Sequence, residues 1–235
     1  MKRKFTKEFT LLELLIVVAV IALLISILMP SLSKARDKAI RAVCLSNLSQ
    51  CARVSAVYAA NNNFILNYSS GINGINSLHW LGGTAIEGFE PYISSWKITD
   101  CPNWALKSLG KGTSPIIGRA QMTGFIYSGG LSTGNMKGSG QNWKPPQTMM
   151  DESNLMLWAD RIETSKSYNA RMPHTVSGYM NGPKRILNIN PSNFGNKGGN
   201  IAYLDGSARW VEQKFMTGQK ADTGRPINMW WKIEE

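Results

Sequence analysis

The hydrophobic pattern near the N-terminus is a continuous apolar run that begins at Phe9 and ends at Met29. A helix rises about 1.5 Å per residue, so a helix over residues 9–29 is about 31 Å long, which matches the hydrocarbon core of a membrane. A short basic segment, residues 1–8, precedes the run. We therefore predict a leader over residues 1–8 and a membrane-spanning helix over residues 9–29.

A second helical pattern follows Pro30, because small and apolar residues recur at steps of three and four as far as residue 60. Proline removes one backbone hydrogen bond and clashes with the preceding turn, so it bends a helix. The asparagines at 61–63 favour a turn and end the pattern. We predict that one long, bent helix continues over residues 30–63 as an amphipathic segment, with an apolar stripe at Ala39, Ala42, Val43, Leu45, Leu48, Ala52, Ser55 and Ala59.

The pattern changes beyond residue 64 to short apolar stretches with long irregular connections. Residues 125–127, 155–159 and 185–189 predict short strands. Residues 200–213 predict a β-hairpin, in which Asp205 and Gly206 supply the positive φ angles of a tight type I′ turn. We therefore expect an α+β fold, with a long N-terminal helix packed on an antiparallel sheet with long loops, and a globular domain over residues 64–235.

Charge gives the helix an orientation. The leader carries four basic residues, whereas residues 14–33 carry none, so the positive-inside rule places the leader in the cytoplasm and residues 30–235 outside. The formal net charge of the whole chain is +11. The basic residues form no dense run or nucleic-acid motif, so we expect no nucleic-acid partner.

Two other interpretations of the N-terminus compete with a processed anchor. An ordinary secretory signal peptide has an apolar core of about 7–15 residues and a small-x-small cleavage site. The run over residues 9–29 is longer, and residues 29–35 make a poor cleavage site. An uncut signal anchor is the second alternative, and the sequence leaves it open.

Glu13 is the one charged residue between Phe9 and Met29. A carboxylate in hydrocarbon costs roughly 2.5–3.5 kcal/mol or more, so such residues usually have a partner and a function. The simpler alternative is a membrane anchor that tolerates one glutamate near its end. The surrounding residues favour a specific role.

The stretch Phe9-Thr10-Leu11-Leu12-Glu13, followed by the apolar run, resembles the prepilin signal of type IV pilins and type II secretion pseudopilins. Leu12 replaces the usual Ile, and Pro30 lies where such helices often carry a proline. One departure is Glu8, which stands where the family has Gly before the cut. The resemblance implies a pilin-like fold, a bacterial origin, and cleavage between Glu8 and Phe9 by a prepilin peptidase.

The resemblance also implies a function and partners. Phe9 is N-methylated after cleavage, and Glu13 of one subunit pairs with the Phe9 ammonium of its neighbour. The chain is then a structural subunit of a type IV pilus-like or type II secretion pseudopilus assembly, which self-associates through its N-terminal helix. It begins in the bacterial inner membrane as a single-pass protein with a periplasmic or extracellular C-terminal domain.

Three further segments resemble a large bacterial group of pilin-like proteins. Residues 44–50 match a Cys-x-x-Asn-Leu-x-Gln pattern, and Cys101-Pro102 matches a later Cys-Pro. Residues 200–206 match the end of a C-terminal His-x9-Asp-Gly motif, although its His position is Gly195 here.

The three cysteines are Cys44, Cys51 and Cys101. In a helix Cys44 and Cys51 lie about 10.5 Å apart along the axis, too far for a disulfide. Cys101 can pair with either of them, and three buried free thiols are the alternative. The family-like motifs imply the pair Cys44–Cys101.

Catalytic chemistry finds little support, so we expect no enzyme and no cofactor. The chain holds only 2 histidines and no Gly-x-Ser-x-Gly, His-Glu-x-x-His or phosphate-loop motif. We expect His174 in a loop and the acidic residues near strand ends, Asp151, Glu152 and Asp160, at the surface. The pseudopilin resemblance implies a calcium site near the C-terminus, to which Asp205 with Asp222 or Asp160 would contribute, although their spacing is not that of a calcium-binding motif and a turn-forming role for Asp205 is the favoured alternative. The cysteines have no recognisable metal-binding spacing with His79 or His174.

The alternative function is an uncut, membrane-tethered extracytoplasmic protein that binds a glycan or another polymer. It requires a cluster of exposed aromatic side chains, for which the candidates are Trp80, Trp96, Trp104 and Trp143. A glycine-rich stretch at 128–140 is a second candidate, although such stretches are more often exposed loops.

Overall fold

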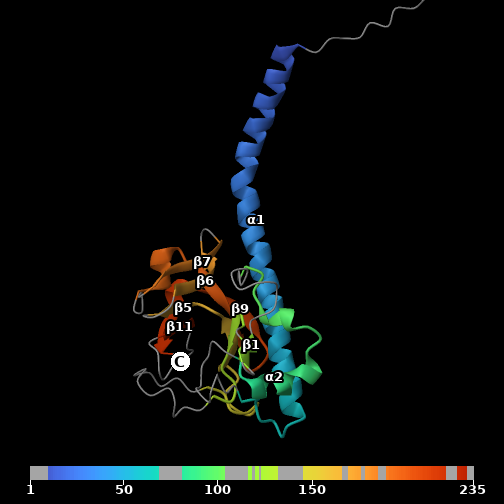
Figure 1. Cartoon of the computed structure of the whole chain (residues 1–235), viewed down its shortest axis with the longest axis vertical. Coiled ribbons are helices and arrows are strands. Elements are labelled where there is room, and N and C mark those ends of the chain that lie inside the picture. Colours follow the sequence, from blue (N-terminus) through green and yellow to red (C-terminus); the bar gives the residue numbers. More distant parts are fainter. Residues whose placement is uncertain are drawn as a thin grey trace, which may run out of the picture. The chain divides into compact units, whose positions relative to one another are not determined.

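A computed structural model describes residues 10–68, 81–103, 116–117, 120–121, 123–131, 145–165, 169–175, 178–184, 189–220 and 227–231. The chain forms two compact units, residues 1–39 and 40–235. Figure 1 shows the order of the elements along the chain.

Helix α1 runs without interruption from Leu11 to Ala60, with Pro30 inside it. The prediction that the helix continues beyond Pro30 is therefore confirmed. The asparagines end the helix as predicted, because Asn62 N donates to the Ala59 carbonyl at 2.9 Å and Asn63 takes a positive φ of 53°.

The second half of α1 buries one face in the second unit. Its buried residues are Cys44, Leu48, Cys51, Ala52, Ser55 and Ala59. Four of the predicted stripe positions lie in this face. Ala39, Ala42 and Val43 are exposed, so the prediction was wrong there. The buried face also includes Cys44 and Cys51. The predicted stripe left them out because it was built mainly from the spacing of aliphatic residues.

The described strands pair in three sheets, all antiparallel. The central sheet has the order β3-β4-β8-β9, with β3 Phe125–Tyr127, β4 Met156–Asp160, β8 Gly198–Tyr203 and β9 Ala208–Glu212. The second sheet has the order β10-β11-β5-β6-β7, with β5 Glu163–Ser165, β6 Asn169–Thr175, β7 Gly178–Lys184, β10 Thr217–Lys220 and β11 Ile227–Trp231. The small pair is β1 Ile116–Ile117 with β2 Ala120–Gln121.

Short helices complete the second unit: α2 Gly83–Phe89 and the 3-10 helices η2 Glu90–Tyr92, η3 Trp96–Thr99, η6 Pro191–Phe194 and η7 Gln213–Phe215. The predicted strands at 125–127 and 155–159 correspond to β3 and β4. In the third predicted strand, residues 185–188 lie outside the described residues, and Ile189 lies in a bend rather than a strand.

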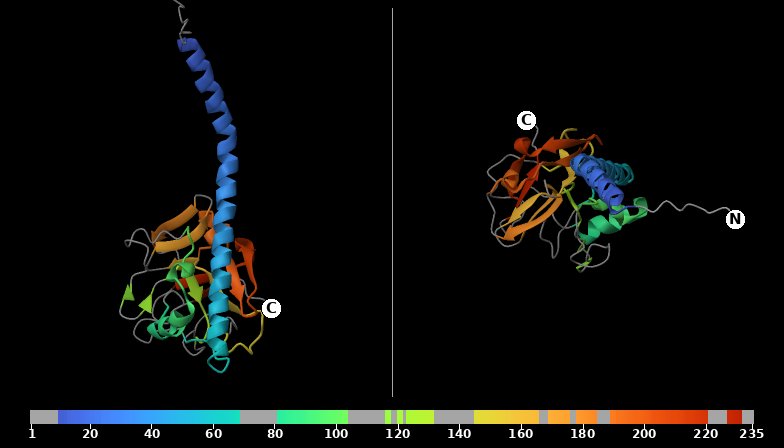
Figure 2. Two further views of the ribbon diagram at one scale, coloured as in Figure 1. Left: turned by 90° about the vertical axis from the view of Figure 1, so that its right-hand side faces the viewer. Right: turned by 90° about the horizontal axis from the view of Figure 1, so that it is seen from above.

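Strands β3, β4 and β8 of the central sheet are buried on both faces, whereas β9 is largely exposed or half-buried. On one face Leu157, Trp158 and Ala202 pack with the buried residues of α1. On the other face Met156 and Ile201 pack in a second cluster that includes residues of β6. The C-terminal half of α1 runs alongside these strands (Figure 2). The expected α+β fold, a long helix packed on an antiparallel sheet, is confirmed.

A buried polar contact fixes α1 on this sheet. Trp158 Nε1 donates to Ser55 Oγ at 2.9 Å, and Ser55 Oγ donates to the Cys51 carbonyl at 3.1 Å. Both side chains are buried, and a buried indole N–H left without an acceptor costs about 1–3 kcal/mol. The contact therefore specifies how α1 faces β4.

The predicted hairpin at 200–213 is confirmed, but its turn type was wrong. Tyr203 N donates to the Ser207 carbonyl at 2.8 Å, and Gly206 N donates to the Tyr203 carbonyl at 3.0 Å. Gly206 has φ 81°, whereas Asp205 does not take a positive φ. The loop therefore covers residues 204–206, in which an ordinary turn is followed by one left-handed glycine.

Candidate functional site

The N-terminal end of α1 is a capping box formed by Thr10 and Glu13. Glu13 Oε2 accepts hydrogen bonds from Thr10 N at 2.9 Å and Thr10 Oγ1 at 3.0 Å, and Glu13 N lies 3.2 Å from Thr10 Oγ1. The pattern Thr-x-x-Glu before an apolar run is the sequence signal of this arrangement, and our sequence analysis missed it. Glu8 and Phe9 lie outside the described residues.

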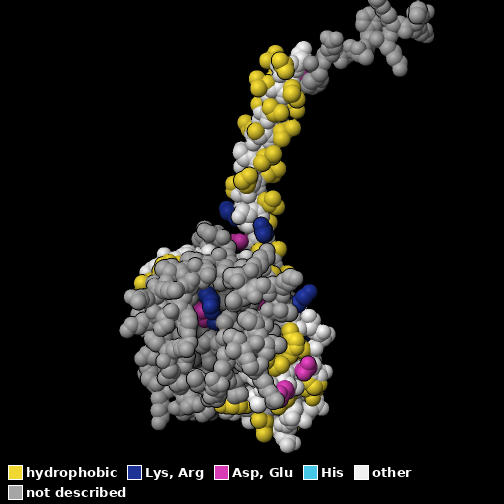
Figure 3. Space-filling view, in the orientation of Figure 1, with side chains coloured by type: hydrophobic (Ala, Val, Ile, Leu, Met, Phe, Trp, Pro, Cys, Tyr) yellow, Lys and Arg dark blue, Asp and Glu magenta, His cyan; other side chains and the backbone are white. Residues whose placement is uncertain are grey.

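The first turns of α1 expose an apolar surface. The large hydrophobic side chains between Leu11 and Met29 are all exposed, and Figure 3 shows them covering the visible face of this segment. Among the described residues, α1 is the one helix long and apolar enough to span a membrane. An apolar groove lies at the proline and is lined by Ala22, Ile25, Ser26, Met29, Pro30 and Ser33.

The second unit holds the predicted disulfide. Cys44 of α1 is bonded to Cys101, which follows η3, with the two Cα atoms 4.9 Å apart. Cys51 is a buried free thiol whose Sγ donates to the Ile98 carbonyl at 3.4 Å. Burial raises the pKa of this thiol, and the nearby Asp100 carboxylate raises it further. Cys51 is therefore protonated and unreactive at neutral pH.

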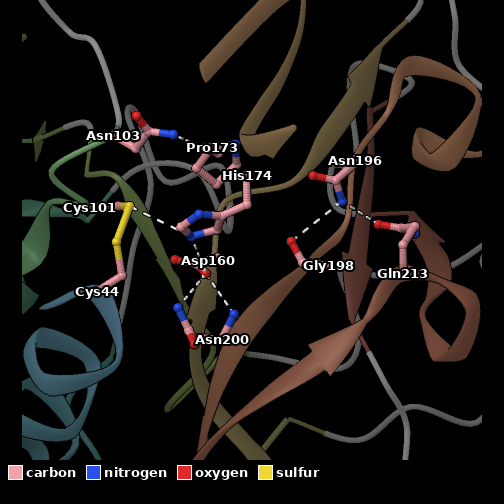
Figure 4. Close-up of polar contacts among 10 residues, drawn as sticks. All are labelled: Cys44, Cys101, Asn103, Asp160, Pro173, His174, Asn196, Gly198, Asn200 and Gln213. Atoms are coloured by element: carbon pink, nitrogen blue, oxygen red, sulfur yellow. Dashed lines mark hydrogen bonds and ion pairs between the residues drawn. A yellow bond between two sulfur atoms is a disulfide. The ribbon is translucent and has the colours of Figure 1, made fainter. Parts of the chain in front are cut away.

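A buried histidine lies beside the disulfide. His174 Nε2 lies 3.0 Å from Asp160 Oδ2 and 3.7 Å from Cys101 Sγ (Figure 4). We expected His174 in a loop and Asp160 at the surface, and both expectations were wrong. His174 lies in β6 and Asp160 ends β4, and the packing of the two sheets buries both side chains.

Asp160 is held by the next strand of its own sheet. Its Oδ2 accepts from Asn200 N at 2.6 Å and from Asn200 Nδ2 at 2.9 Å (Figure 4). Its Oδ1 is buried and accepts no hydrogen bond from the described residues. Asn200 opens the motif that the sequence singled out, but the spacing of the other residues gave no signal of this cluster.

Aromatic contacts extend the cluster toward α1. The His174 ring meets the Trp210 ring edge-on, with centroids 5.2 Å apart. The Arg41 guanidinium lies 4.1 Å from the centroid of the same indole. Trp210 therefore lies between the buried cluster and a cation of α1.

The remaining candidates have structural roles. Asp205 is exposed in the hairpin loop, where its Oδ1 accepts from Ser207 N at 2.8 Å. It belongs to no group of three potential metal ligands in the part of the chain that the structure describes. Asp222 and His79 lie outside that part. Asp151 Oδ2 accepts from Gln147 N and Thr148 N, which holds a turn, and Glu152 is exposed.

The aromatic candidates do not form a described surface. Trp96 is half-buried and packs against the core cluster that contains the buried residues of α1. Trp80, Trp104 and Trp143 lie outside the described residues, as does most of the glycine-rich stretch at 128–140.

Comparison with known proteins finds a similarity over a short part of the chain. Over 57 residues, the chain is 42% identical to the type IV wide pilus major component PilA4 of Thermus thermophilus. The match covers 24% of this chain and 44% of that protein, so it spans less than half of the relative. No family model and no solved structure matches the chain. The similarity is therefore to a pilin over part of this chain, and the long helix on an antiparallel sheet is a pilin-like arrangement.

Proposed function

We propose that the chain is a structural subunit of a type IV pilus-like or type II secretion pseudopilus-like filament. A prepilin peptidase removes residues 1–8, Phe9 is N-methylated, and the subunits self-associate through α1. Before assembly the protein resides in the inner membrane, with residues 9–29 spanning it and the domain at 64–235 outside. The segment at 30–63 joins the two as the amphipathic continuation of the helix.

The observation that carries this proposal is the exposed apolar half of α1. No other described part of the chain covers its large hydrophobic side chains between Leu11 and Met29. Either lipid or the helices of other subunits remove such a surface from water. Each Å² of apolar surface that is buried contributes roughly 25 cal/mol of favourable free energy. The similarity to a pilus major component favours other subunits as the final cover. The groove at Pro30 offers a neighbouring helix a place of close approach.

Glu13 has two separable roles in this account. Within one chain it caps α1 through Thr10. Between chains its carboxylate neutralises the new Phe9 ammonium of a neighbour. A buried ion pair that loses one partner typically costs about 3–5 kcal/mol, so the charge matters most in the assembled state.

The substitution Glu13→Gln separates the two roles, because glutamine keeps the capping box but removes the charge. We expect Glu13→Gln to reduce the filament fraction sheared from cells as severely as Glu13→Ala, while both variants accumulate in the membrane at the normal level. Immunoblotting of the sheared and membrane fractions measures both quantities. Glu152→Ala, which removes an exposed carboxylate, is the matched control and assembles normally.

Normal filaments from Glu13→Gln together with a defect in Glu13→Ala would reduce the role of Glu13 to capping. Normal filaments from both variants would count against a helix-driven assembly and in favour of the uncut, tethered binding protein.

A further inference from the structure

The cluster at the disulfide contains the donor set of a zinc site. Cys44, Cys101, Asp160 and His174 are all buried and each offers one ligand atom, and these atoms lie within 4.8 Å of one another. Structural zinc sites use four ligands in a tetrahedron, drawn from thiolate sulfur, imidazole nitrogen and carboxylate oxygen. The four residues come from α1, the segment after η3, β4 and β6, so only the folded second unit assembles them.

We propose that this cluster binds one Zn²⁺ ion when the Cys44–Cys101 disulfide is reduced. The ligands are the two thiolates, His174 Nε2 and an Asp160 carboxylate oxygen. The disulfide and the metal exclude each other, because both use the same two sulfur atoms. The cluster therefore has an oxidised form closed by a covalent bond and a reduced form closed by a metal.

The distances fit this assignment with small movements. Zn–S and Zn–N bonds of about 2.3 and 2.0–2.1 Å place the ligand atoms of a tetrahedron about 3.3–3.8 Å apart. His174 Nε2 and Cys101 Sγ are already 3.7 Å apart. His174 Nε2 lies 3.0 Å from Oδ2 of the Asp160 carboxylate, whose other oxygen, Oδ1, is the proposed ligand. The two sulfurs separate on reduction, and spacings of up to 4.8 Å between the ligand atoms close by about 1 Å or less.

The Asp160 carboxylate has one oxygen that its present contacts leave for a metal. Both hydrogen bonds from Asn200 go to Oδ2, which leaves the buried Oδ1 without a partner among the residues that the structure describes. A buried carboxylate oxygen without a partner is costly, and a metal bond satisfies it. Hydrogen bonds to one oxygen of a ligating carboxylate are the usual way in which a protein orients that ligand.

The conversion of the disulfide form to the zinc form requires a reductant, for which we name a dithiol. The dithiol gives two electrons and two protons to the Cys44–Cys101 disulfide, which yields two thiols and an oxidised dithiol. Binding of Zn²⁺ then releases the two thiol protons to solvent. The imidazole binds in its neutral form, with its proton on Nδ1. Two thiolates and one carboxylate offset the charge of the ion.

The test uses the full chain in detergent, reduced without oxygen and titrated with Co²⁺, which reports four-coordinate thiolate sites by its absorption. We expect about one Co²⁺ per chain, a thiolate-to-cobalt charge-transfer band, and loss of the band when Zn²⁺ is added. The oxidised chain gives no band. Far-UV circular dichroism checks that the reduced chain is folded, with or without the metal.

Matched variants assign the site. Cys51→Ala removes the third cysteine and keeps the band, whereas Cys101→Ser and His174→Ala lose it. Asn200→Ala keeps all four ligands and weakens Co²⁺ binding about 10–100-fold. The proposal is overturned if the reduced folded chain binds no Co²⁺, if the reduced chain is unfolded and Zn²⁺ does not refold it, or if Cys101→Ser binds as well as the parent chain.

Discussion

At the scale of single residues, Asp100 has the clearest consequence for solution behaviour. Burial raises the pKa of its carboxyl to about 6, and the hydrogen bond from Gly124 N to Oδ1, at 2.9 Å, only partly opposes this. The pKa in the unfolded chain is near 3.8. The folded state therefore holds this proton more tightly, and the stability that it contributes is lost as the pH rises through about 6.

We expect Asp100→Asn to stabilise the protein at pH 8 by about 1–3 kcal/mol, because asparagine removes a half-buried charge and keeps an acceptor for Gly124 N. The gain over the parent chain should shrink as the pH falls below about 6 and vanish below about pH 3.8. Urea unfolding followed by tryptophan emission at several pH values measures it. A gain that is independent of pH would contradict the assigned cause.

Two glycines of the β8–β9 hairpin differ in how strongly their surroundings oppose a side chain. Gly198 has φ 142°, and a Cβ there would lie 2.1 Å from the Val211 carbonyl oxygen and 3.0 Å from Glu212 Cα. Gly206 has φ 81° and open space around it. Only backbone strain opposes a side chain at Gly206, whereas strain and a backbone clash both oppose one at Gly198.

We expect Gly206→Ala to cost about 1–2 kcal/mol and Gly198→Ala about 3 kcal/mol or more. Thermal unfolding of the full chain in detergent compares the two variants. Equal losses would mean that the start of β8 relaxes more easily than its backbone contacts indicate.

At the scale of elements, the disulfide decides how firmly α1 is held to the domain. It joins Cys44 to Cys101 across a sequence separation of 57 residues. Closing a loop of that length in the unfolded chain stabilises the folded state by about 2–4 kcal/mol. The contact between Trp158 and Ser55, and Asn47 Nδ2 donating to the Asp100 carbonyl at 3.1 Å, hold the same face of α1 without a covalent bond.

We expect the double variant Cys44→Ser/Cys101→Ser to lose about 2–4 kcal/mol of unfolding free energy in a buffer that contains a metal chelator. Cys51→Ala is the matched control, since it removes a buried thiol and leaves the cross-link. Urea unfolding under oxidising conditions compares the three chains. A loss in the control as large as that in the double variant would assign the effect to core packing rather than to the cross-link.

At the scale of the whole molecule, the sequence predicted what depends on local pattern. A long apolar run, three- and four-residue spacing and a run of asparagines predicted α1 and its end. Apolar stretches on both sides of an Asp-Gly pair predicted the β8–β9 hairpin. The pairing of Cys44 with Cys101 followed from a family resemblance. The limits of the buried stripe depend on packing, and the turn type depends on the φ angle of one residue. Both predictions were partly wrong.

The buried cluster was beyond sequence reasoning for a different reason. Cys101, Asp160 and His174 lie far apart in the chain and follow no known spacing. They meet because β4, β6 and the segment after η3 come together in the folded domain. His174 stands after a proline and Asp160 at a strand end, which locally favour a loop and the surface. Only the tertiary arrangement makes both of them core residues.

The central claim is that this chain is processed as a prepilin and assembled through its N-terminal helix. Mass spectrometry of the N-terminal peptide, taken from membranes of the native host, tests it most directly. The account predicts a peptide that begins at N-methylated Phe9, despite Glu8 before the cut. A chain that begins at Met1 or Lys2 would contradict it and would make the uncut, membrane-tethered binding protein the leading interpretation.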